Sequence, residues 1–173
     1  MSDDPLVDLA ARLGDSCLAS GVTVATVESC TGGLVGHAIT ERAGSSAWYV
    51  GGFVTYSNGL KQTAVGVPND VLAFHGAVSA QTAMAMATGG RERTGASVAV
   101  AVTGVAGPDG GTDEKPVGLT YVAVADGTGQ TVRRYLWTGD RTANKHASAV
   151  AALELLLERV RAIRGVGETS DPS

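Results

Sequence analysis

The chain has few cysteines, few aromatic residues and little lysine. Two of its 173 residues are cysteines, three are lysines, and 5% are aromatic. One disulfide between Cys17 and Cys30 is conceivable, but so few cysteines favour a reduced chain in the cytoplasm. The net charge is −4, and basic residues form no block along the sequence. A nucleic-acid-binding protein usually carries a basic stripe, so we expect no nucleic-acid partner.

Long apolar runs are also missing. No stretch of the sequence approaches the roughly 20 apolar residues that a membrane-spanning helix needs. The first ten residues, MSDDPLVDLA, are acidic and lack the basic and apolar regions of a signal peptide. Hydrophobic residues still make up 44% of the chain, which is enough for a globular core. We therefore expect a soluble, cytoplasmic protein with no membrane partner.

The hydrophobic pattern predicts alternating helices and strands in the first part of the chain. Apolar residues at helical spacing follow Pro5, and Gly21 is expected to end that helix. Residues 22–28 and 96–104 are apolar on both faces, as central buried strands are. A further strand is expected at 46–57, where a glycine pair suggests a bulge. Further helices are expected at about 33–42, 59–65, 69–74, 80–95 and 140–163, the fourth capped by Ser79.

The last part of the chain predicts an antiparallel hairpin. Residues 117–126 and 130–139 read as strands on either side of the short segment GTG. Strands that alternate with helices early, and a hairpin late, imply a three-layer α/β/α domain. Its sheet is expected to be mixed and largely parallel, with the hairpin at its C-terminal end. No repeat or linker interrupts the sequence, so we predict one domain over 1–164 and a solvated tail over 165–173.

Hydroxyls, a thiol and glycines gather at one predicted strand-to-helix junction, ESCTGG at 28–33. A second segment, TGVAGPDGG at 103–111, also follows a buried strand with a hydroxyl and then glycines. In open α/β sheets, ligands bind beyond the carboxyl ends of the strands. A helix that begins near Gly33 would aim backbone N–H groups at a bound anion. The two junctions therefore predict a site for a phosphate or a developing oxyanion.

Ser29 lies in the first junction, where its hydroxyl needs a base to become a nucleophile. The three histidines are poorly placed, with His37 and His146 on helices and His75 in a short connector. Lysine is the alternative base, because desolvation lowers its pKa. Lys61 follows the strand that is expected next to the first one. On the residues alone, Ser29 fits a helix cap equally well, and Lys61 fits an ordinary surface lysine.

Five segments together resemble one known family in order and spacing. They are ESCTGGL, GSSAWYVGGFVTYSNGLK, GAVS, AVTGVAGPDGGT and KPVGLTYVAVA. Across almost all of residues 5–163 the chain resembles the CinA C-terminal domain family, whose members include stand-alone nicotinamide mononucleotide amidohydrolases. The resemblance implies hydrolysis of the carboxamide of that nucleotide to nicotinate mononucleotide and ammonia. It implies no metal or organic cofactor, and it implies self-association into a homodimer or a larger homo-oligomer.

The resemblance also implies roles for individual residues. Ser29 matches the family's nucleophile, and Lys61 matches its proposed general base. Tyr56 and Thr103 match polar residues of the same pocket and complete the predicted catalytic set. The glycine-rich junctions and the start of the last helix supply the predicted substrate-binding residues, which are Thr31, Gly32, Gly33, Gly104, Gly107 and Arg141.

Other interpretations of these residues stay open. Thr31 and the glycines after it could simply make a tight turn, and Tyr56 could be a half-buried strand residue. Cys30 is a competing nucleophile, although its position should turn it towards the core. Lys145 stands where we expect an arginine, four residues after Arg141, so phosphate affinity could be weaker or the substrate different. A non-catalytic nucleotide-binding or regulatory domain is the alternative function, and it would need no lysine beside the serine.

Aromatic residues concentrate in the segment 46–57. Trp48, Tyr49, Phe53 and Tyr56 all fall there, in a chain that is 5% aromatic. Aromatic residues are enriched in the cores of protein interfaces. A strand with aromatics on both faces needs two apolar surfaces to cover them. We therefore expect this segment at a subunit contact, unless helices of the same chain cover both faces.

Overall fold

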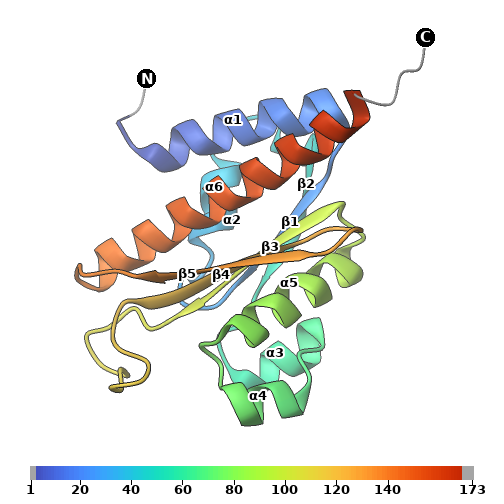
Figure 1. The fold of residues 1–173 in the computed structure, drawn as a ribbon. Helices are drawn as coiled ribbons and strands as arrows, with labels where there is room; N and C mark the ends of the chain where they lie inside the picture. The colour runs from blue at the N-terminus through green and yellow to red at the C-terminus, as the bar shows by residue number, and fades with distance from the viewer. Residues whose placement is uncertain (1–2, 169–173) are drawn as a thin grey trace.

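A five-stranded mixed sheet forms the centre of the computed structural model, which describes residues 3–168 and side chains as far as Ile163. The strands lie in the order β2-β1-β3-β4-β5 between two layers of helices (Figure 1). β1 pairs in parallel with β2 and β3, whereas the β3–β4 and β4–β5 pairs are antiparallel. The strands are β1 Val24–Glu28, β2 Tyr49–Val54, β3 Val98–Gly104, β4 Leu119–Ala125 and β5 Gln130–Leu136. The predicted three-layer fold, with a mixed sheet and a late hairpin, is confirmed.

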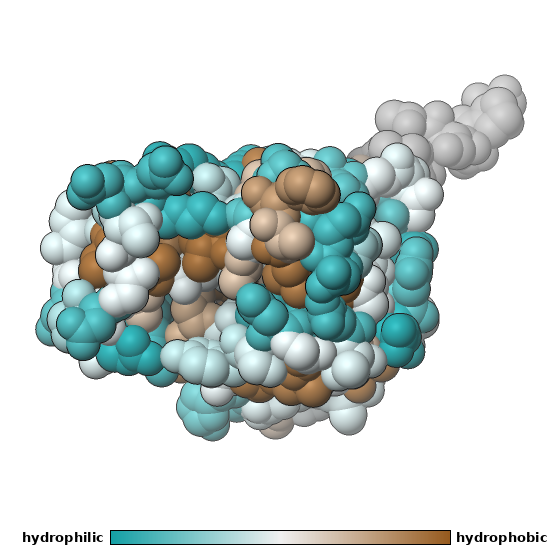
Figure 2. All heavy atoms as spheres, turned by 90° about the horizontal axis from the view of Figure 1, so that it is seen from below, coloured by the Kyte–Doolittle hydropathy of each residue, from teal (hydrophilic) through white to brown (hydrophobic). Residues whose placement is uncertain are grey.

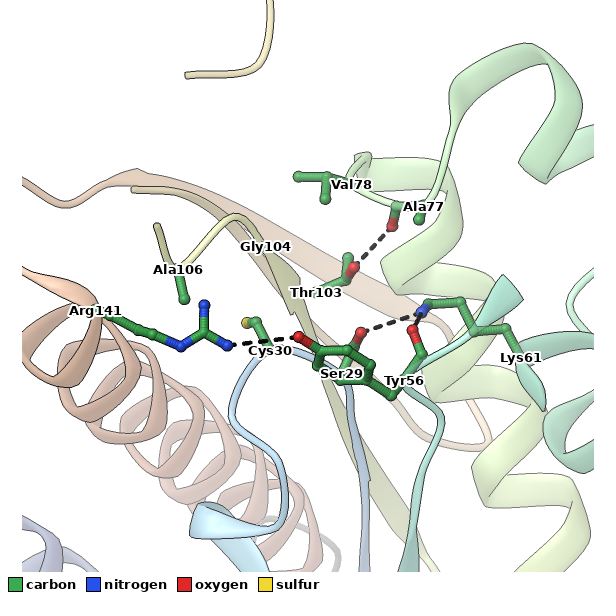
Figure 3. A pocket seen from close by; sticks show the side chains of 10 residues that line it. All are labelled: Ser29, Cys30, Tyr56, Lys61, Ala77, Val78, Thr103, Gly104, Ala106 and Arg141. Atoms are coloured by element: carbon green, nitrogen blue, oxygen red, sulfur yellow. Dashed lines mark hydrogen bonds between the residues drawn. The ribbon is translucent and has the colours of Figure 1, made fainter. Parts of the chain in front are cut away.

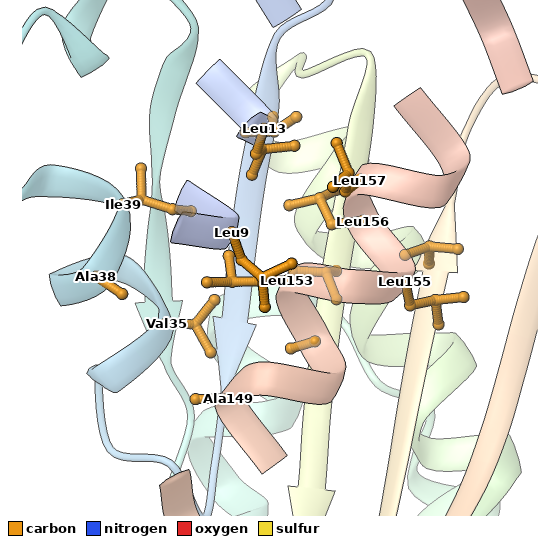
Figure 4. Close-up of a cluster of buried hydrophobic side chains, with 14 of the residues drawn as sticks. Leu9, Leu13, Val35, Ala38, Ile39, Ala149, Leu153, Leu155, Leu156 and Leu157 are labelled. Atoms are coloured by element: carbon orange, nitrogen blue, oxygen red, sulfur yellow. The ribbon is translucent and has the colours of Figure 1, made fainter. Parts of the chain in front are cut away.

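The helices cover both faces of this sheet. α1, α2 and α6 lie on one side, and α3, α4 and α5 lie on the other (Figure 1). The larger hydrophobic cluster fills the space between α1, α2, α6 and the sheet (Figure 4), and a second cluster lies beneath α5. The helices are α1 Pro5–Ser20, α2 Leu34–Thr40, α3 Asn58–Val65, α4 Asn69–His75, α5 Ala80–Thr94 and α6 Arg141–Glu168, with a 3-10 turn at Ser45–Ala47.

The ends of the helices follow the sequence signals in two places and depart from them in one. Gly21 ends α1 in the left-handed conformation, with a φ of 68°. Ser79 caps α5, where its hydroxyl accepts a hydrogen bond from the backbone N–H of Thr82. By contrast, α6 continues to Glu168, so the predicted tail begins as helix. The rest of that predicted tail, 169–173, lies outside the described residues.

The glycine pair of β2 does mark a bulge, because the register with β1 shifts between Val24 and Ala25. Trp48 and Tyr49 pack into the larger core cluster, whereas Phe53 packs into the cluster beneath α5. Trp48 is only 2% exposed. Helices of the same chain therefore cover Trp48 fully and Tyr49 and Phe53 in part. The alternative without a subunit contact holds for Trp48, and the subunit contact itself stays a prediction.

The parallel strands bring the two glycine-rich junctions together. Glu28 at the end of β1 pairs with Val102 of β3 and with Val54 of β2. The segments that follow β1, β2 and β3 therefore leave the sheet at the same edge. No helix in the described part of the chain is both long and apolar enough to cross a lipid bilayer.

Candidate active site

Ser29 follows β1 directly, and Lys61 reaches it from the first turn of α3. The Nζ atom of Lys61 lies 3.1 Å from Ser29 Oγ, within hydrogen-bond distance (Figure 3). Both side chains are buried, with 7% of Ser29 and 1% of Lys61 exposed. Because β1 and β2 are parallel neighbours, the turn after one strand and the helix after the other meet at this edge. The structure thus brings together the two residues that the sequence suggested as nucleophile and base.

The surroundings of Lys61 favour a neutral amine. Besides Ser29, its Nζ contacts two carbonyl oxygens, those of Thr55 at 2.8 Å and Tyr56 at 3.1 Å. None of the ion pairs found among the described residues involves Lys61. Burial lowers the pKa of Lys61, and the nearby Cys30 thiol acts weakly in the opposite direction. A neutral amine has two N–H donors for the two carbonyls and one lone pair for the hydroxyl proton of Ser29.

Glu28 is a site residue that the sequence analysis missed. Its carboxylate is 2% exposed and accepts a hydrogen bond of 2.7 Å from the Thr31 hydroxyl. It also accepts from the backbone N–H groups of Gly33, Val35 and Gly36, at 3.2, 2.9 and 3.0 Å. A buried carboxylate is costly unless it is fully hydrogen-bonded. An acidic residue at the end of an otherwise apolar strand is the sequence signal that could have pointed to this buried carboxylate.

This carboxylate corrects one expectation about anion binding. Because Glu28 occupies the N–H groups at the start of α2, that helix end is not open to a substrate anion. Thr31, Gly32 and Gly33 do not line the cavity beside Ser29. The two glycines instead shape the turn, with left-handed φ values of 61° and 104°.

A cavity of about 170 Å³ opens beside Ser29. Its lining includes the four residues predicted to be catalytic, together with Gly104 and Arg141 from the predicted substrate-binding set (Figure 3). A second cavity of about 520 Å³ adjoins it and shares Ala106 and Arg141. The first cavity is lined by Ser29, Cys30, Tyr56, Lys61, Ala77, Val78, Thr103, Gly104, Ala106 and Arg141. The second is completed by Pro108, Val117, Gly139, Asp140 and Thr142.

Arg141 spans the site from the first position of α6. Its guanidinium donates to the carbonyl of Gly107 at 2.7 Å. It also donates to the hydroxyl of Tyr56 at 3.5 Å (Figure 3). Gly107 therefore contacts Arg141 but does not line either cavity. Tyr56 is 63% exposed and lies beyond the end of β2, so it is not a half-buried strand residue. Its hydroxyl and the arginine form a polar rim around the cavity.

Thr103 ties the end of β3 to the connector between α4 and α5. Its hydroxyl donates a hydrogen bond of 2.7 Å to the carbonyl of Ala77 (Figure 3). Ala77 and Val78 form the wall of the cavity opposite Arg141. The hydroxyl of Thr103 therefore faces the cavity with its proton already committed to the protein. Its remaining hydrogen-bonding capacity is that of an acceptor.

Cys30 also lines the cavity, beside Ser29. It belongs to the larger hydrophobic cluster and is 7% exposed, in keeping with the expected turn towards the core. Burial raises the pKa of this thiol to about 11. A thiol with so high a pKa carries little thiolate near neutral pH, and the thiolate is the reactive form. Both Cys30 and Cys17 are free, so the disulfide considered from the sequence is absent.

One residue of α6, Asn144, supports the rim of the site, and its neighbour Lys145 lies near the turn after β1. Asn144 is buried and holds the loop after β3 through a hydrogen bond of 3.0 Å to the carbonyl of Ala106. Its side-chain oxygen also accepts from the backbone N–H of Gly139 at 3.0 Å. Lys145 lies near the turn after β1, since a methyl group added to Gly32 would be 3.9 Å from its Nζ. Lys145 is not part of the cavity lining beside Ser29.

The histidines lie away from Ser29. The rings of His37 and His146 face Glu41 and Asp4, at 3.9 and 3.0 Å. His75 contributes its carbonyl to the ammonium of Lys115. Across the described residues, no group of three or more His, Cys, Asp or Glu side chains could hold a metal ion. Lysine is thus the basic side chain within reach of the serine.

The fold and the site define an α/β domain with a serine–lysine pair beside a cavity at the carboxyl edge of its sheet. The model of the CinA C-terminal domain family matches residues 6–160. The chain therefore belongs to the CinA C-terminal domain family, as the sequence motifs suggested.

Curated relatives fall into two groups by length. The chain is 45% identical over 160 residues to the nicotinamide-nucleotide amidohydrolase PncC of Escherichia coli K12, covering 92% of this chain and 97% of that protein. It is 51% identical over 140 residues to a CinA-like protein of Geobacter sulfurreducens, covering 81% of this chain but 34% of that protein. The chain thus spans about a third of the CinA-like relative and nearly all of the PncC relative.

Solved structures agree with this assignment. The crystal structure of the competence/damage inducible protein CihA from Agrobacterium tumefaciens matches with a TM-score of 0.88 and 44% sequence identity. The match covers 91% of this chain and 98% of that one. A CinA superfamily protein from Klebsiella pneumoniae matches with a TM-score of 0.87 and 33% identity.

Proposed function

We propose that this chain hydrolyses the carboxamide of nicotinamide mononucleotide to nicotinate mononucleotide and ammonia. The observation that carries the proposal is the buried pair of Ser29 and Lys61, 3.1 Å apart beside a cavity. The likeness to PncC, which spans 97% of that relative, supports the choice of substrate. The serine–lysine pair supports the choice of reaction, because a desolvated amine can activate a hydroxyl.

The reaction needs one base that later acts as an acid. Neutral Lys61 takes the hydroxyl proton as Ser29 Oγ bonds to the amide carbon. The ammonium form of Lys61 then gives that proton to the leaving nitrogen, and ammonia departs from an acyl-enzyme. A water molecule loses a proton to Lys61 and attacks the acyl carbon. As the bond from that carbon to Ser29 Oγ breaks, Lys61 returns the proton to Ser29 Oγ, which restores the hydroxyl and the neutral amine; the acid product gives up its proton to ammonia or solvent and leaves as the carboxylate.

The developing oxyanion needs hydrogen-bond donors in the cavity. The N–H groups at the start of α2 already serve Glu28, so they are not the donors. We assign this role to the backbone N–H of Cys30, because this residue follows the nucleophile in the chain and is part of the lining of the same cavity. The side chain of Cys30 has no part in this assignment.

The two adjoining cavities suit the two ends of a pyridine nucleotide. The cavity of about 170 Å³ holds the reactive pair and suits the carboxamide ring. The cavity of about 520 Å³ then takes the ribose and phosphate. Arg141 borders both, and a guanidinium is well suited to pair with a phosphate.

Ammonia release from nicotinamide mononucleotide tests the proposal directly. Purified protein is incubated with this nucleotide and with a panel of nucleotide and non-nucleotide amides. Release from the nucleotide that disappears in Ser29→Ala supports the hydrolase. Tight binding of the nucleotide without any release would favour the alternative, a non-catalytic nucleotide-binding or regulatory domain.

We also propose that the chain works in the cytoplasm as a homodimer or larger homo-oligomer. The two free, buried thiols suit a reducing compartment. At the β2 edge of the sheet, Val50 and Val54 are 50% and 45% exposed, and the strand carries no charged residue. An uncharged, apolar edge favours pairing with another copy, whereas the β5 edge is protected by Arg133 and Arg134. Hydrophobic residues also reach the surface on the side of α3, α4 and α5 (Figure 2).

A further inference from the structure

Glu28 is hydrogen-bonded both to the turn that carries the nucleophile Ser29 and to Thr55, whose carbonyl orients Lys61. Its carboxylate accepts four hydrogen bonds from the segment 31–36, which follows Ser29. Its backbone carbonyl accepts a hydrogen bond of 2.8 Å from the N–H of Thr55. The carbonyl of Thr55 in turn accepts from Lys61 Nζ at 2.8 Å. One residue is thus linked to both halves of the serine–lysine pair.

We propose that Glu28 is a positioning residue, whose carboxylate holds the turn after β1 in the shape that sets Ser29 Oγ against Lys61 Nζ. The inference rests on the proposed function, because it takes Ser29 as the nucleophile. Glu28 does not line the cavity and so does not touch the substrate.

The turn needs such an anchor. Gly32 and Gly33 both adopt left-handed conformations, and glycine is the residue with the most backbone freedom to lose. Glu28 itself is fixed, since it lies in β1 and pairs with strands on both sides. A carboxylate on a fixed strand that binds the far end of a glycine turn restricts the positions open to Ser29. The segment that Glu28 binds is also tightly packed at Gly36, where an added methyl group would be 2.8 Å from the hydroxyl of Tyr49.

The electrostatic role of Glu28 is separate from the activation of Lys61. Burial lowers the pKa of Lys61, and the charge of the Cys30 thiolate would raise it. Glu28 is not among the causes of this shift. The rate falls on the acidic side of the pH–rate profile as Lys61 becomes protonated. Loss of the Glu28 charge should therefore not shift the pH at which this fall occurs. Loss of position should instead lower the plateau of that profile.

The test compares Glu28→Gln with wild type in activity and in crystal structure. The amide keeps the shape of the side chain, but its NH2 group meets the backbone N–H of Val35 or Gly36, so two donors face each other. We expect kcat for nicotinamide mononucleotide to fall by about 10- to 100-fold, the scale of a misplaced reacting group, with little change in KM. The crystal structure should show the distance from Ser29 Oγ to Lys61 Nζ lengthened beyond hydrogen-bond reach.

Two further variants make the comparison specific. Thr31→Val keeps the side-chain shape and removes one of the four hydrogen bonds, so its kcat should fall less than that of Glu28→Gln. It also serves if Glu28→Gln does not fold. Asp126→Asn is the matched control, because Asp126 also accepts backbone N–H bonds, from Thr128 and Gly129, in the hairpin after β4. It should lower the melting temperature without changing kcat.

The outcomes separate this inference from the proposed function. If wild type releases no ammonia from the nucleotide, the proposed function fails, and the distance in the variant still decides the positioning role. An unchanged Ser29–Lys61 distance in folded Glu28→Gln overturns the positioning role, whatever its activity. So does a kcat loss in Asp126→Asn as large as that in Glu28→Gln, because the effect would then reflect general destabilisation.

Discussion

The carbonyl oxygen of Thr55 accepts a hydrogen bond of 2.8 Å from Lys61 Nζ. A second carbonyl, that of Tyr56, lies 3.1 Å from the same nitrogen. Because these two carbonyls take two of the three directions around Nζ, the remaining direction points at Ser29 Oγ. The backbone after β2 therefore orients the base, and the strand beside it presents the nucleophile.

Replacement of Lys61 by arginine should abolish activity as completely as replacement by alanine. A guanidinium keeps the positive charge but stays protonated at any working pH, so it cannot accept the proton of Ser29. Both Lys61→Arg and Lys61→Ala should lose at least about 10³-fold in the rate of ammonia release, as removal of a catalytic group does. Wild-type activity in Lys61→Arg would remove Lys61 from the role of base.

Removal of the buried amine should change how the stability of the fold depends on pH. Burial lowers the pKa of Lys61 below its usual value of 10.5 in the folded state, so the unfolded state binds more protons. The resulting cost to wild type is full below the lowered pKa and disappears as pH rises through 10.5. The difference in unfolding midpoint between Lys61→Met and wild type should thus favour the variant more at pH 7 than at alkaline pH, so the margin shrinks as the pH rises. A margin that grows with pH would contradict the lowered pKa.

Ser29 and Cys30 should respond in opposite ways to truncation. Ser29→Ala should lose at least about 10³-fold in turnover, on the scale of nucleophile removal. Cys30→Ala should stay active, because burial raises the pKa of that thiol to about 11 and leaves little thiolate at neutral pH. Near-normal turnover in Ser29→Ala would contradict the serine mechanism, and loss of activity in Cys30→Ala alone would favour the thiol.

The sequence could predict the meeting of Ser29 and Lys61 because strand topology decides it. Two apolar runs, each followed by a polar turn, become parallel neighbours, and their ends then share one edge. The role of Glu28 could not be predicted in the same way. It depends on a side-chain conformation that turns a carboxylate back onto the following helix, and no spacing rule specifies that. The opposite orientation of Tyr49 and Phe53 likewise depends on the register shift against β1, which the glycine pair signals but does not measure.

Arg141 should govern the affinity for the phosphorylated substrate. It borders both cavities, and its guanidinium is anchored by the carbonyl of Gly107 at 2.7 Å. Arg141→Ala should raise KM for nicotinamide mononucleotide by about 10- to 100-fold, the scale of a lost charge-assisted hydrogen bond. For an amide without a phosphate the change should be small. Arg12→Ala, an exposed arginine of α1 paired with Asp8, is the matched control and should leave both KM values unchanged.

The uncharged edge of the sheet should hold the homo-oligomer together. Val50 is 50% exposed on β2, an edge strand without charged residues, so a lysine there would place a charge where another copy is expected to pair. Light scattering at micromolar concentration should give an oligomer for wild type and a smaller mass for Val50→Lys. Leu18→Lys is the control, because Leu18 is 55% exposed on α1 and should tolerate the charge without a change in mass. A monomer mass for wild type would contradict the proposed homo-oligomer. Every contact to the substrate phosphate would then have to come from one chain, with Arg141 as its main cation.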